Sequence, residues 1–370
     1  MSGQPRVAIV VNSPPGGVLG PRVESFARGL SSEFRIEVLW RQSTRPRAIV
    51  AFFSQLRRFR PDLLYLVDLG YPAAVASLMY QQASSCALVI ETGDPLAELL
   101  WASGRVGKIG RLAIRRYEQL VLRRADGVVV RGSGLKEYVA GLGVTRVDTV
   151  PDGVDTVLFH PMDVAELRQA LDLGDCVSIG VMGSLNWSER LQWGYGSELV
   201  QALGLLKEFP VRGVVVGDGL GRAKLERQAA ELGVRERIRF VGHIPHVSLP
   251  AYINAMDICL STQTNDSVGR SRTTAKLPLF LSCGRFVLAS KVGEAARLLP
   301  DVMLVDYHEG FDADYPTRLA RRIEQLVREP QLLGLGEQNR RIAQSQFDYG
   351  CLTPRLATLL QAVLDRRAPR

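Results

Sequence analysis

The sequence predicts an α/β protein of two domains, each built on a doubly wound parallel sheet. Its 370 residues are too many for one ordinary core and suit two domains of roughly 100–200 residues each. Short β-rich runs alternate with longer amphipathic ones along most of the chain. The β-rich runs are nearly continuous in apolar residues, as is typical of parallel strands buried on both faces.

The first half of the chain alternates six predicted strands with helices. The strands are expected at 7–11, 36–40, 63–67, 86–91, 127–130 and 146–150. The helices are expected from about Arg22 and near 47–58, 72–83 and 105–123. This strict alternation predicts a parallel sheet with helices on both faces.

The alternation restarts after "VPDGVDTVLFHP" (150–161), whose proline and glycine residues interrupt both helix and strand patterns. We expect a linker there and a domain boundary near 160–176. Six further strands are predicted at 177–183, 211–219, 237–242, 257–261, 285–290 and 302–306. Open α/β sheets bind ligands beyond the carboxyl ends of their strands, so two such domains facing each other predict an active site in the cleft between them.

Composition indicates a soluble globular protein. The chain is 46% hydrophobic and 23% charged, without a low-complexity tract or an apolar run long enough to span a bilayer. It enters its first strand at once and has no secretory signal pattern, so we expect a cytoplasmic location. The five cysteines are far apart and lack metal-binding spacing, which favours buried reduced thiols. The net charge of +8 suggests an anionic partner without distinguishing nucleotide, nucleic acid or acidic lipid.

Four longer stretches follow one another in a recognisable order. They are "RRADGVVVRGSGLKEYVAGLGV", "VPDGVDTVLFHP", "VVVGDGLGRAKLERQAAELGVRERIRFVGHIPHVSLPAYINAMDICLS" and "CGRFVLASKVGEAARLL". Together they resemble the family 4 (GT4-like) retaining glycosyltransferases, which have the GT-B fold. The resemblance covers nearly the whole chain.

The resemblance implies two facing Rossmann-like domains. Residues 1–165 would form the acceptor-side domain, and 166–346 would bind a nucleotide sugar linked to UDP, GDP, ADP or dTDP. Residues 347–370, with "FDYGCLTPRLATLLQAVL", resemble the C-terminal helix that crosses back onto the first domain. Such enzymes transfer a sugar to a hydroxyl of a glycan, glycolipid or small metabolite, and they usually need no metal or other cofactor.

Two segments are candidates for binding the donor diphosphate. Gly16 and Gly17 lie between the first strand and the first helix, where glycine lets a backbone approach a phosphate, although a plain turn is the alternative. The second segment, "GRSRTTAKLPLFLSCG" (269–284), is basic and rich in hydroxyl groups before an apolar helix. There Thr273 or Thr274 would cap the helix, while Arg272 and Lys276 would face an anion. A solvated basic loop is the alternative.

The same segment departs from the family pattern. The two glutamates that the family places around this helix correspond to Ser271 and Leu279. The family also has an arginine and a lysine in the region that is "GSLNWSERLQWGYG" here. Arg190 is the one cation of that stretch, and it either substitutes for them or is merely exposed.

Three further donor contacts are implied by the resemblance. His243 and Ile244 of "VGHIP" lie where relatives present backbone groups to the nucleobase. Asp218 of "VVVGDGLG" follows a strand end and would border the donor, unless it belongs to an ordinary glycine turn.

On the acceptor side, "VIETGDP" ends a buried strand with Glu91 and Asp94. Relatives carry a His or Asp facing the cleft at this place. A carboxylate there would orient an acceptor hydroxyl or take its proton, so both residues are candidate catalytic groups. Capping of the following turn is the alternative for Asp94.

Residues 105–124 carry seven cations and one acid on an expected helix. Such a helix suits peripheral contact with acidic lipid at the inner membrane face, while a solvated basic surface is the alternative. We expect its Leu, Ile and Val side chains to be core.

The leading functional hypothesis is a glycosyltransferase. The missing carboxylates at Ser271 and Leu279 keep open a non-catalytic GT-B protein that binds or scaffolds, and a nucleotide-sugar epimerase is a third hypothesis, because fold alone does not separate these functions.

Overall fold

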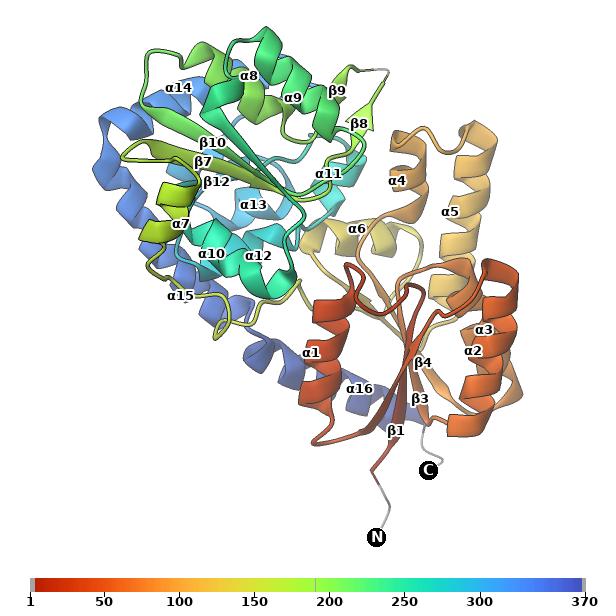
Figure 1. Ribbon diagram of the computed structural model, residues 1–370. Helices are drawn as coiled ribbons and strands as arrows, with labels where there is room; N and C mark the ends of the chain where they lie inside the picture. Colours follow the sequence, from red (N-terminus) through yellow and green to blue (C-terminus); the bar gives the residue numbers. More distant parts are fainter. Residues whose placement is uncertain (1–3, 190, 368–370) are drawn as a thin grey trace. The chain divides into compact units, whose positions relative to one another are not determined.

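The computed structural model describes residues 4–189 and 191–367 (Figure 1). The chain forms two compact units. Unit 1 contains Met1–Gly153, Ser267–Thr273 and Tyr349–Arg370, and unit 2 contains Val154–Asp266 and Thr274–Asp348. The sequence predicts changes of domain at 165/166 and 346/347 and does not anticipate that 267–273 belongs with the first unit.

Unit 1 is built on a parallel sheet of six strands in the order β2-β1-β3-β4-β5-β6. Val7 of β1 lies opposite Ile36 of β2 and Leu63 of β3. The strands are β1 (Arg6–Val11), β2 (Arg35–Trp40), β3 (Leu63–Val67), β4 (Ala87–Thr92), β5 (Gly127–Val130) and β6 (Val147–Thr149). The chain order reverses between β1 and β3, which makes their carboxyl ends the switch point of this sheet.

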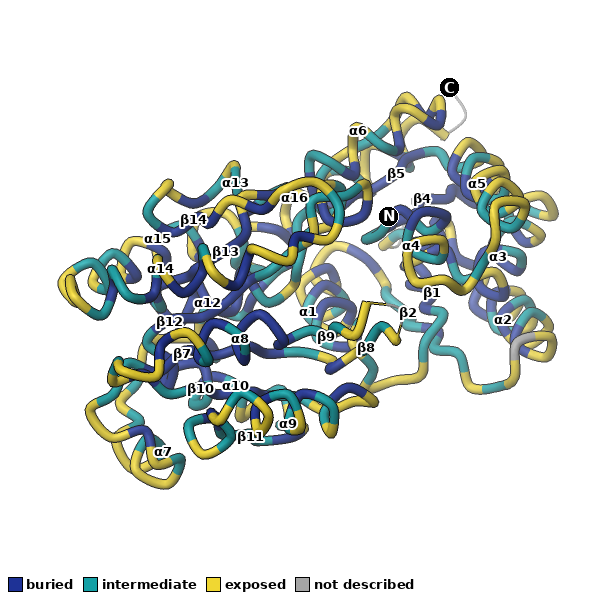
Figure 2. The backbone as a smooth tube through the Cα atoms, turned by 90° about the horizontal axis from the view of Figure 1, so that it is seen from above, coloured by how far each residue is buried: buried dark blue, intermediate teal, exposed yellow. Residues whose placement is uncertain are grey.

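Two separate cores cover the two faces of this sheet. Alternate residues of β1 point to opposite faces, with Ile9 in one core and Val10 in the other. One core contains α1 (Gly20–Leu30) and α16 (Tyr349–Arg367); the other contains α2 (Arg45–Phe59), α3 (Tyr71–Ala83), α5 (Lys108–Arg123) and α6 (Ser133–Gly141). Strands β1, β3, β4 and β5 form the buried centre of the unit, whereas the edge strands β2 and β6 are partly exposed (Figure 2). The predicted C-terminal helix of the GT-B fold is therefore confirmed.

Unit 2 repeats the architecture with the strand order β11-β10-β7-β12-β13-β14, and its chain order reverses between β7 and β12. The strands are β7 (Val177–Met182), β10 (Val211–Val216), β11 (Ile238–Gly242), β12 (Ile258–Ser261), β13 (Phe286–Ser290) and β14 (Leu304–Val305). Figure 1 shows α8 (Ser197–Leu205), α9 (Arg222–Glu231) and α14 (Tyr315–Arg328) over one face, and α10 (Leu249–Asn254), α12 (Lys276–Ser282) and α15 (Gly336–Gln346) over the other.

All twelve strands predicted from the sequence are present, most within one or two residues at each end. The prediction did not include the short hairpin of β8 (Trp187–Ser188) and β9 (Trp193–Gly194), nor the unit 1 helices α4 (Leu96–Ala102) and α6. These elements are short, and a short stretch gives too few residues to show a hydrophobic period in the sequence. The prediction that both domains are doubly wound parallel sheets is confirmed.

A buried ionic cluster links elements at the carboxyl ends of the unit 1 strands. Glu91 at the end of β4 is fully buried and accepts hydrogen bonds from Arg22 of α1 at 2.9 Å and from Arg131 after β5 at 2.7 Å. Tyr65 of β3 also donates its hydroxyl hydrogen bond to this carboxylate. Asp152 lies 3.3 Å from Arg131, so two carboxylates face two guanidinium groups. The cluster joins α1, three strands and the 150–152 segment.

The protonation state of Glu91 follows from these contacts. Burial alone would raise the pKa of this carboxyl, but Arg22 and Arg131 outweigh it and lower the pKa to about 2. A carboxyl with a lowered pKa stabilises the fold fully above its ordinary value, and this contribution is lost as the pH falls toward 2.

We predict that Glu91→Gln lowers the free energy of unfolding by about 3–5 kcal/mol, because it leaves two buried guanidinium groups poorly neutralised. Urea denaturation followed by circular dichroism measures the loss. Glu24→Gln, on the exposed side of α1, is the matched control and should be neutral. The wild-type protein should also lose more stability than Glu91→Gln on going from pH 5 to pH 3. Equal stability of the wild type and Glu91→Gln would show that the cluster contributes nothing net.

Candidate functional site

The residues that follow the strands define a candidate site edge in each unit. Ligands of doubly wound sheets bind at the carboxyl ends of the strands near the switch point. This edge lies after β1 and β3 in unit 1, and after β7 and β12 in unit 2.

Lys276 at the start of α12 is the central cation of the unit 2 edge. Its ammonium lies 3.7 Å from the centre of the Tyr195 ring, which is a close cation–π contact. It also lies beside the turn that follows β7, because a Cβ added to Gly183 would be 3.2 Å from Nζ. Lys276 is half-buried, so its position is fixed by the ring while part of the side chain stays accessible.

Glycine is required where β7 and β10 end. Gly217 has φ +135°, and a Cβ added there would lie 1.9 Å from the carbonyl oxygen of Gly183. Gly183 itself has φ +149°, a backbone conformation that other residues rarely adopt. The two turns therefore touch backbone to backbone, and the space beside Lys276 is lined by main chain.

A group of buried oxygens lies behind Tyr195. Among the described residues, Glu198 Oε1, Thr262 Oγ1, Tyr195 Oη and Tyr315 Oη are buried without a hydrogen bond of standard geometry. They interact nonetheless: Thr262 lowers the pKa of both Glu198 and Tyr315. Burial raises the pKa of Glu198 overall, while Gly196 N–H donates to its other oxygen at 3.1 Å and Lys276 favours its charged form. Glu198, Thr262 and Tyr315 therefore form one polar group of interacting side chains beside Tyr195.

The sequence analysis missed Tyr195 and Glu198. Tyr195 lies within "GSLNWSERLQWGYG", and Glu198 follows two residues after it. The family pattern predicts an arginine and a lysine in this region and does not point to an aromatic ring. The available signal was a tyrosine and a glutamate on either side of the residues that begin α8. Arg190, the cation predicted for this stretch, lies outside the described residues.

The other predicted donor residues of unit 2 have mainly local contacts. Asp218 is exposed, accepts a hydrogen bond from Gly219 N–H at 2.7 Å and lies 3.4 Å from Arg222. His243 is exposed after β11, and Ile244 packs against the core of the unit. Their contacts with a donor remain predictions.

The basic segment 269–276 is divided between the two units. Arg272 and Thr273 belong to unit 1, where Arg272 pairs with Asp94 and the Thr273 hydroxyl donates to Asp152 at 3.2 Å. Thr274 and Lys276 belong to unit 2. The prediction that Thr273 or Thr274 caps the helix is wrong: the N-cap is Ala275, and no side chain caps the helix. Thr273 is held by Asp152 instead, and Thr274 Oγ1 is buried without a hydrogen-bond partner among the described residues.

The two positions where family carboxylates are missing have different surroundings. Leu279 is only 9% exposed and belongs to the core of unit 2, so no polar atom replaces the glutamate at this position of α12. Ser271 is the last residue of α11 (Ser267–Ser271), in unit 1. Any ribose contact must therefore come from another side chain or from the main chain.

Asp94 is a partly exposed carboxylate at the unit 1 edge. It follows β4, and Arg272 Nε is 2.9 Å from its Oδ1, an ion pair whose angle is not that of a hydrogen bond. Burial raises the pKa of Asp94, although Arg272 and Arg131 oppose the rise. Its side chain does not cap α4, because Glu118 does so by accepting from Leu96 N–H at 2.7 Å.

Glu91 and Asp94 therefore differ in character. Glu91 is completely buried and engaged by two arginines, whereas Asp94 is one-third exposed and has raised proton affinity. A group that takes a proton from a ligand must be reachable and must bind protons at working pH. This geometry favours Asp94 for that role and a structural role for Glu91.

The switch point of unit 1 holds polar groups that the sequence analysis overlooked. The side chain of Asn12 packs directly over Gly70, where a Cβ would lie 1.8 Å from its amide nitrogen. Asn12 Oδ1 and Ser13 Oγ are buried without hydrogen-bond partners among the described residues, and Asp68 is exposed with φ +73°. Gly16 in the same loop has φ +75° and open space around it, and Gly17 accepts a hydrogen bond from Gly20 N–H at 2.8 Å. Phosphate contact by these glycines remains a prediction.

The basic helix α5 has an apolar stripe on its outer side. Ile109 is 87% exposed, Leu112 60% and Leu120 57%, so the expectation that the apolar residues of this segment are core is wrong for these three. Val121 and Leu122 are buried as expected. No helix in the described part of the chain is both long and apolar enough to cross a membrane. Within the same residues, no cluster of three or more His, Cys, Asp or Glu side chains is arranged to hold a metal ion.

Comparisons with known proteins agree with this architecture. A family model described as "Glycosyl transferase 4-like domain" matches residues 5–153, and a second, "Glycosyl transferases group 1", matches residues 177–329. A 2-deoxystreptamine glucosyltransferase from Streptomyces kanamyceticus is 30% identical over 181 residues, which cover 46% of each chain. The chain thus spans about half the length of such relatives.

Solved structures match over nearly the full length. Sucrose-phosphate synthase from Thermosynechococcus elongatus superposes with a TM-score of 0.79 at 17% identity, covering 98% of this chain and 100% of the other. Anabaena HepE in complex with UDP-glucose gives a TM-score of 0.76 at 18% identity, covering 96% and 99%. At this level of identity the likeness establishes the fold. With two family models in sequence along the chain and the doubly wound sheets of both units, the protein belongs to the GT4-like glycosyltransferases of GT-B fold.

Proposed function

We propose that the protein transfers a sugar from a nucleotide-sugar donor to a hydroxyl acceptor, with retention of the anomeric configuration. The observation that carries this proposal is the Lys276 ammonium, held over Tyr195 beside the glycine turns that end β7 and β10. A fixed cation and approachable main chain suit the negative charge of a leaving nucleoside diphosphate. Anabaena HepE, which shares the fold, has been solved in complex with UDP-glucose, and this supports the same donor class.

Unit 2 would bind the donor. In place of the family arginine and lysine, Lys276 supplies the charge, and the buried oxygens around Glu198 supply polar partners for ordered water or donor hydroxyls. Because Leu279 provides no ribose acceptor, the nucleotide base and ribose would be held by main-chain groups near His243 and Ile244. The proposal also includes the other candidate donor contacts. They are Gly16 and Gly17 for the diphosphate, and Asp218, Arg190 and Thr274 near the donor.

Unit 1 would bind the acceptor, which is a glycan, a glycolipid or a small metabolite in glycan biosynthesis. Asp94 would orient the acceptor hydroxyl and accept its proton while the new bond to the sugar forms. Its raised pKa suits this task, and Arg272 keeps it ionised and in place. Glu91 would hold the loop that carries Asp94.

Contact with an acidic membrane would bring a lipid-linked acceptor to unit 1. The exposed stripe of Ile109, Leu112 and Leu120 lies on a helix whose Lys108, Arg115 and Arg116 are also exposed. Such a face inserts apolar side chains between lipids while its cations bind the headgroups.

A non-catalytic binding protein is the second candidate, because Ser271 and Leu279 replace both family glutamates. Nucleotide binding and sugar turnover separate the two functions, since a scaffold protein that has lost donor chemistry would show no turnover.

Thermal shift with UDP, GDP, ADP and dTDP should reveal one nucleotide that raises the melting temperature by several degrees, since a ligand of the folded state alone stabilises it. Lys276→Ala should abolish most of that shift. Lys207→Ala, at an exposed lysine of the same unit, should leave it intact. No change in melting temperature with any of the four nucleotides would favour the non-catalytic function. Undiminished nucleotide binding by Lys276→Ala would refute the assignment of Lys276 to the diphosphate.

Asp94→Asn should lower kcat by about 10²–10⁴-fold, the usual contribution of a general base, without changing nucleotide affinity. Because burial raises the pKa of Asp94, the acidic limb of the pH–rate profile should lie above the value of a free aspartate and should disappear in the variant. Product analysis by NMR with a donor panel measures the rate and the anomeric configuration. Asp148→Asn, at an exposed position of the same unit, is the control. Full activity of Asp94→Asn would remove it from the mechanism.

Vesicles containing phosphatidylglycerol should sediment the protein, and neutral phosphatidylcholine vesicles should not. Replacing Arg115 and Arg116 with Gln should weaken binding by about 1 kcal/mol for each cation, and Leu112→Glu should weaken it further. Leu205→Glu places the same charge at an exposed leucine of unit 2 and should have no effect. Equal sedimentation of the α5 variants and this control would exclude α5 as the contact.

A further inference from the structure

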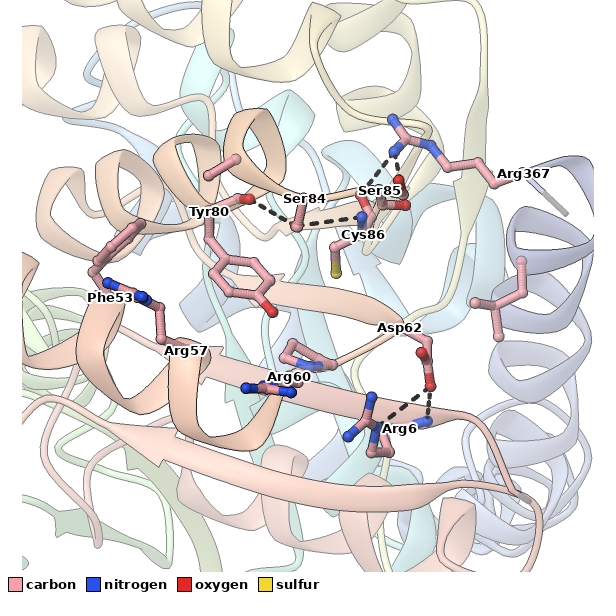
Figure 3. Close-up of a pocket in the computed structure, with 13 residues that line it drawn as sticks. Arg6, Phe53, Arg57, Arg60, Asp62, Tyr80, Ser84, Ser85, Cys86 and Arg367 are labelled. Carbon is pink, nitrogen blue, oxygen red and sulfur yellow. Dashed lines mark hydrogen bonds and ion pairs between the residues drawn. The ribbon is translucent and has the colours of Figure 1, made fainter. Parts of the chain in front are cut away.

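A cavity of about 730 Å³ opens in unit 1 at the edge where β1, β3 and β4 begin (Figure 3). It is at the opposite end of these strands from Asp94 and the switch point. Its walls come from the start of β1, the ends of α2 and α3, the segments before β3 and β4, and the end of α16. The lining residues used below are Arg6, Arg57, Arg60, Tyr80, Ser84 and Arg367.

The lining is strongly basic. Four arginines and a single carboxylate, Asp62, contribute to it. Asp62 accepts a hydrogen bond from the main-chain N–H of Arg6 at 2.7 Å and lies 3.7 Å from its guanidinium, while Arg367 pairs with Asp126 at 3.0 Å. For Arg57 and Arg60, no carboxylate of the described chain lies within ion-pair distance, and both side chains are exposed. The cavity therefore has a positive charge that the protein does not neutralise.

Tyr80 supplies a hydrogen-bond donor to the same space. The residue is only 7% exposed, and among the described residues its hydroxyl has no hydrogen-bond partner. Figure 3 shows this hydroxyl directed into the cavity, on the side of Arg60. Its ring is held edge-on against Phe53, with centroids 6.3 Å apart. Burial raises the pKa of Tyr80, so the hydroxyl stays protonated and can donate.

The remaining polar groups do not change this charge. Burial raises the pKa of the Cys86 thiol to about 12, so it is neutral under ordinary conditions. Ser84 donates its hydroxyl hydrogen bond to the carbonyl of Tyr80 at 2.7 Å. The anion-binding capacity of the cavity thus rests on its arginines and on Tyr80.

Complementing the dipole at the end of α2 is a simpler reason for basic residues there. It accounts for Arg57 and Arg58 in the last turn of α2, of which only Arg57 lines the cavity. Arg6 and Arg367, from β1 and α16, are held by their own partners Asp62 and Asp126. The helix dipole does not explain why the buried Tyr80 directs its hydroxyl into the space that Arg57 and Arg60 line. The arrangement of Tyr80 with Arg57 and Arg60 suits a ligand that accepts hydrogen bonds from several directions.

We propose that this cavity binds a small organic phosphate. Arg57, Arg60 and Tyr80 would hold the phosphate, because guanidinium forks match its oxygens. Phe53, Pro61 and Leu364 would contact the carbon skeleton, for which the cavity has room. The site is separate from the donor-binding edge and does not depend on the proposed transferase activity.

Isothermal titration with phenyl phosphate and with inorganic phosphate tests this site on the full-length protein at low salt. Phenyl phosphate should bind more tightly, because its ring adds apolar contact, and added salt should weaken both. The double variant Arg57→Gln/Arg60→Gln should raise the Kd at least about tenfold, since hydrogen bonds to charged groups are lost. Tyr80→Phe should raise it severalfold while leaving the melting temperature nearly unchanged.

Two control variants distinguish this cavity from the neighbouring basic surface and from the donor edge of unit 2. Arg58→Gln removes a neighbouring charge outside the cavity and should bind like the parent. Lys276→Ala should also bind phenyl phosphate like the parent, even if it loses nucleotide. A double variant that binds as well as Arg58→Gln would overturn the proposal, as would loss of phenyl phosphate binding in Lys276→Ala. Binding by phosphatidylglycerol vesicles alone, with no heat from phenyl phosphate, would overturn it too.

Discussion

The burial of Glu91 is the constraint on which the first unit depends. A carboxylate with no access to water is stable only when neighbouring groups neutralise it, and here Arg22, Arg131 and Tyr65 do so. These partners come from the start of α1, the middle of β3 and the residue after β5, so one buried charge links three elements of the unit. The same arginines reach Asp152, which in turn accepts from Thr273. The loop that contains Asp94 therefore begins beside this buried ionic cluster.

The corresponding edge of unit 2 is built from different interactions. Among its described residues, the turn after β7 has no buried arginine–glutamate pair of this kind; instead, glycines let two turns touch through their main chains, and an aromatic ring supports Lys276. A ring positions a cation without neutralising its charge, which suits an edge that receives an anion. Buried polar side chains around Glu198 lie beside this ring and interact with one another. This contrast supports assigning the donor to unit 2 and the acceptor to unit 1.

The basic stretch 269–276 illustrates how one segment can serve two environments. Its first part is committed to unit 1 through Arg272 with Asp94 and Thr273 with Asp152, and its last part carries Lys276 in unit 2. Replacement of the family glutamates fits this division. At Leu279 the helix gains a core contact, and at Ser271 a small residue ends α11. The charge of the stretch is thus distributed between a carboxylate partner in one unit and an aromatic platform in the other.

The twelve strands and the doubly wound sheets were predictable from the sequence alone, because a strand buried on both faces requires a continuous apolar run and leaves a clear pattern. The order of four characteristic stretches indicated the family. The sequence also indicated Lys276 and Asp94, which follow strand ends or begin a helix where open sheets bind ligands. Only the tertiary structure decided which groups are partnered. The partners of Glu91, the Tyr195 ring beneath Lys276 and the cavity lined by Arg6, Arg57, Arg60 and Arg367 all join residues distant in sequence. The exposure of the apolar stripe on α5 likewise depends on which neighbours pack against that helix. Their charges and burial depend on three-dimensional neighbours, which periodicity along one chain does not encode.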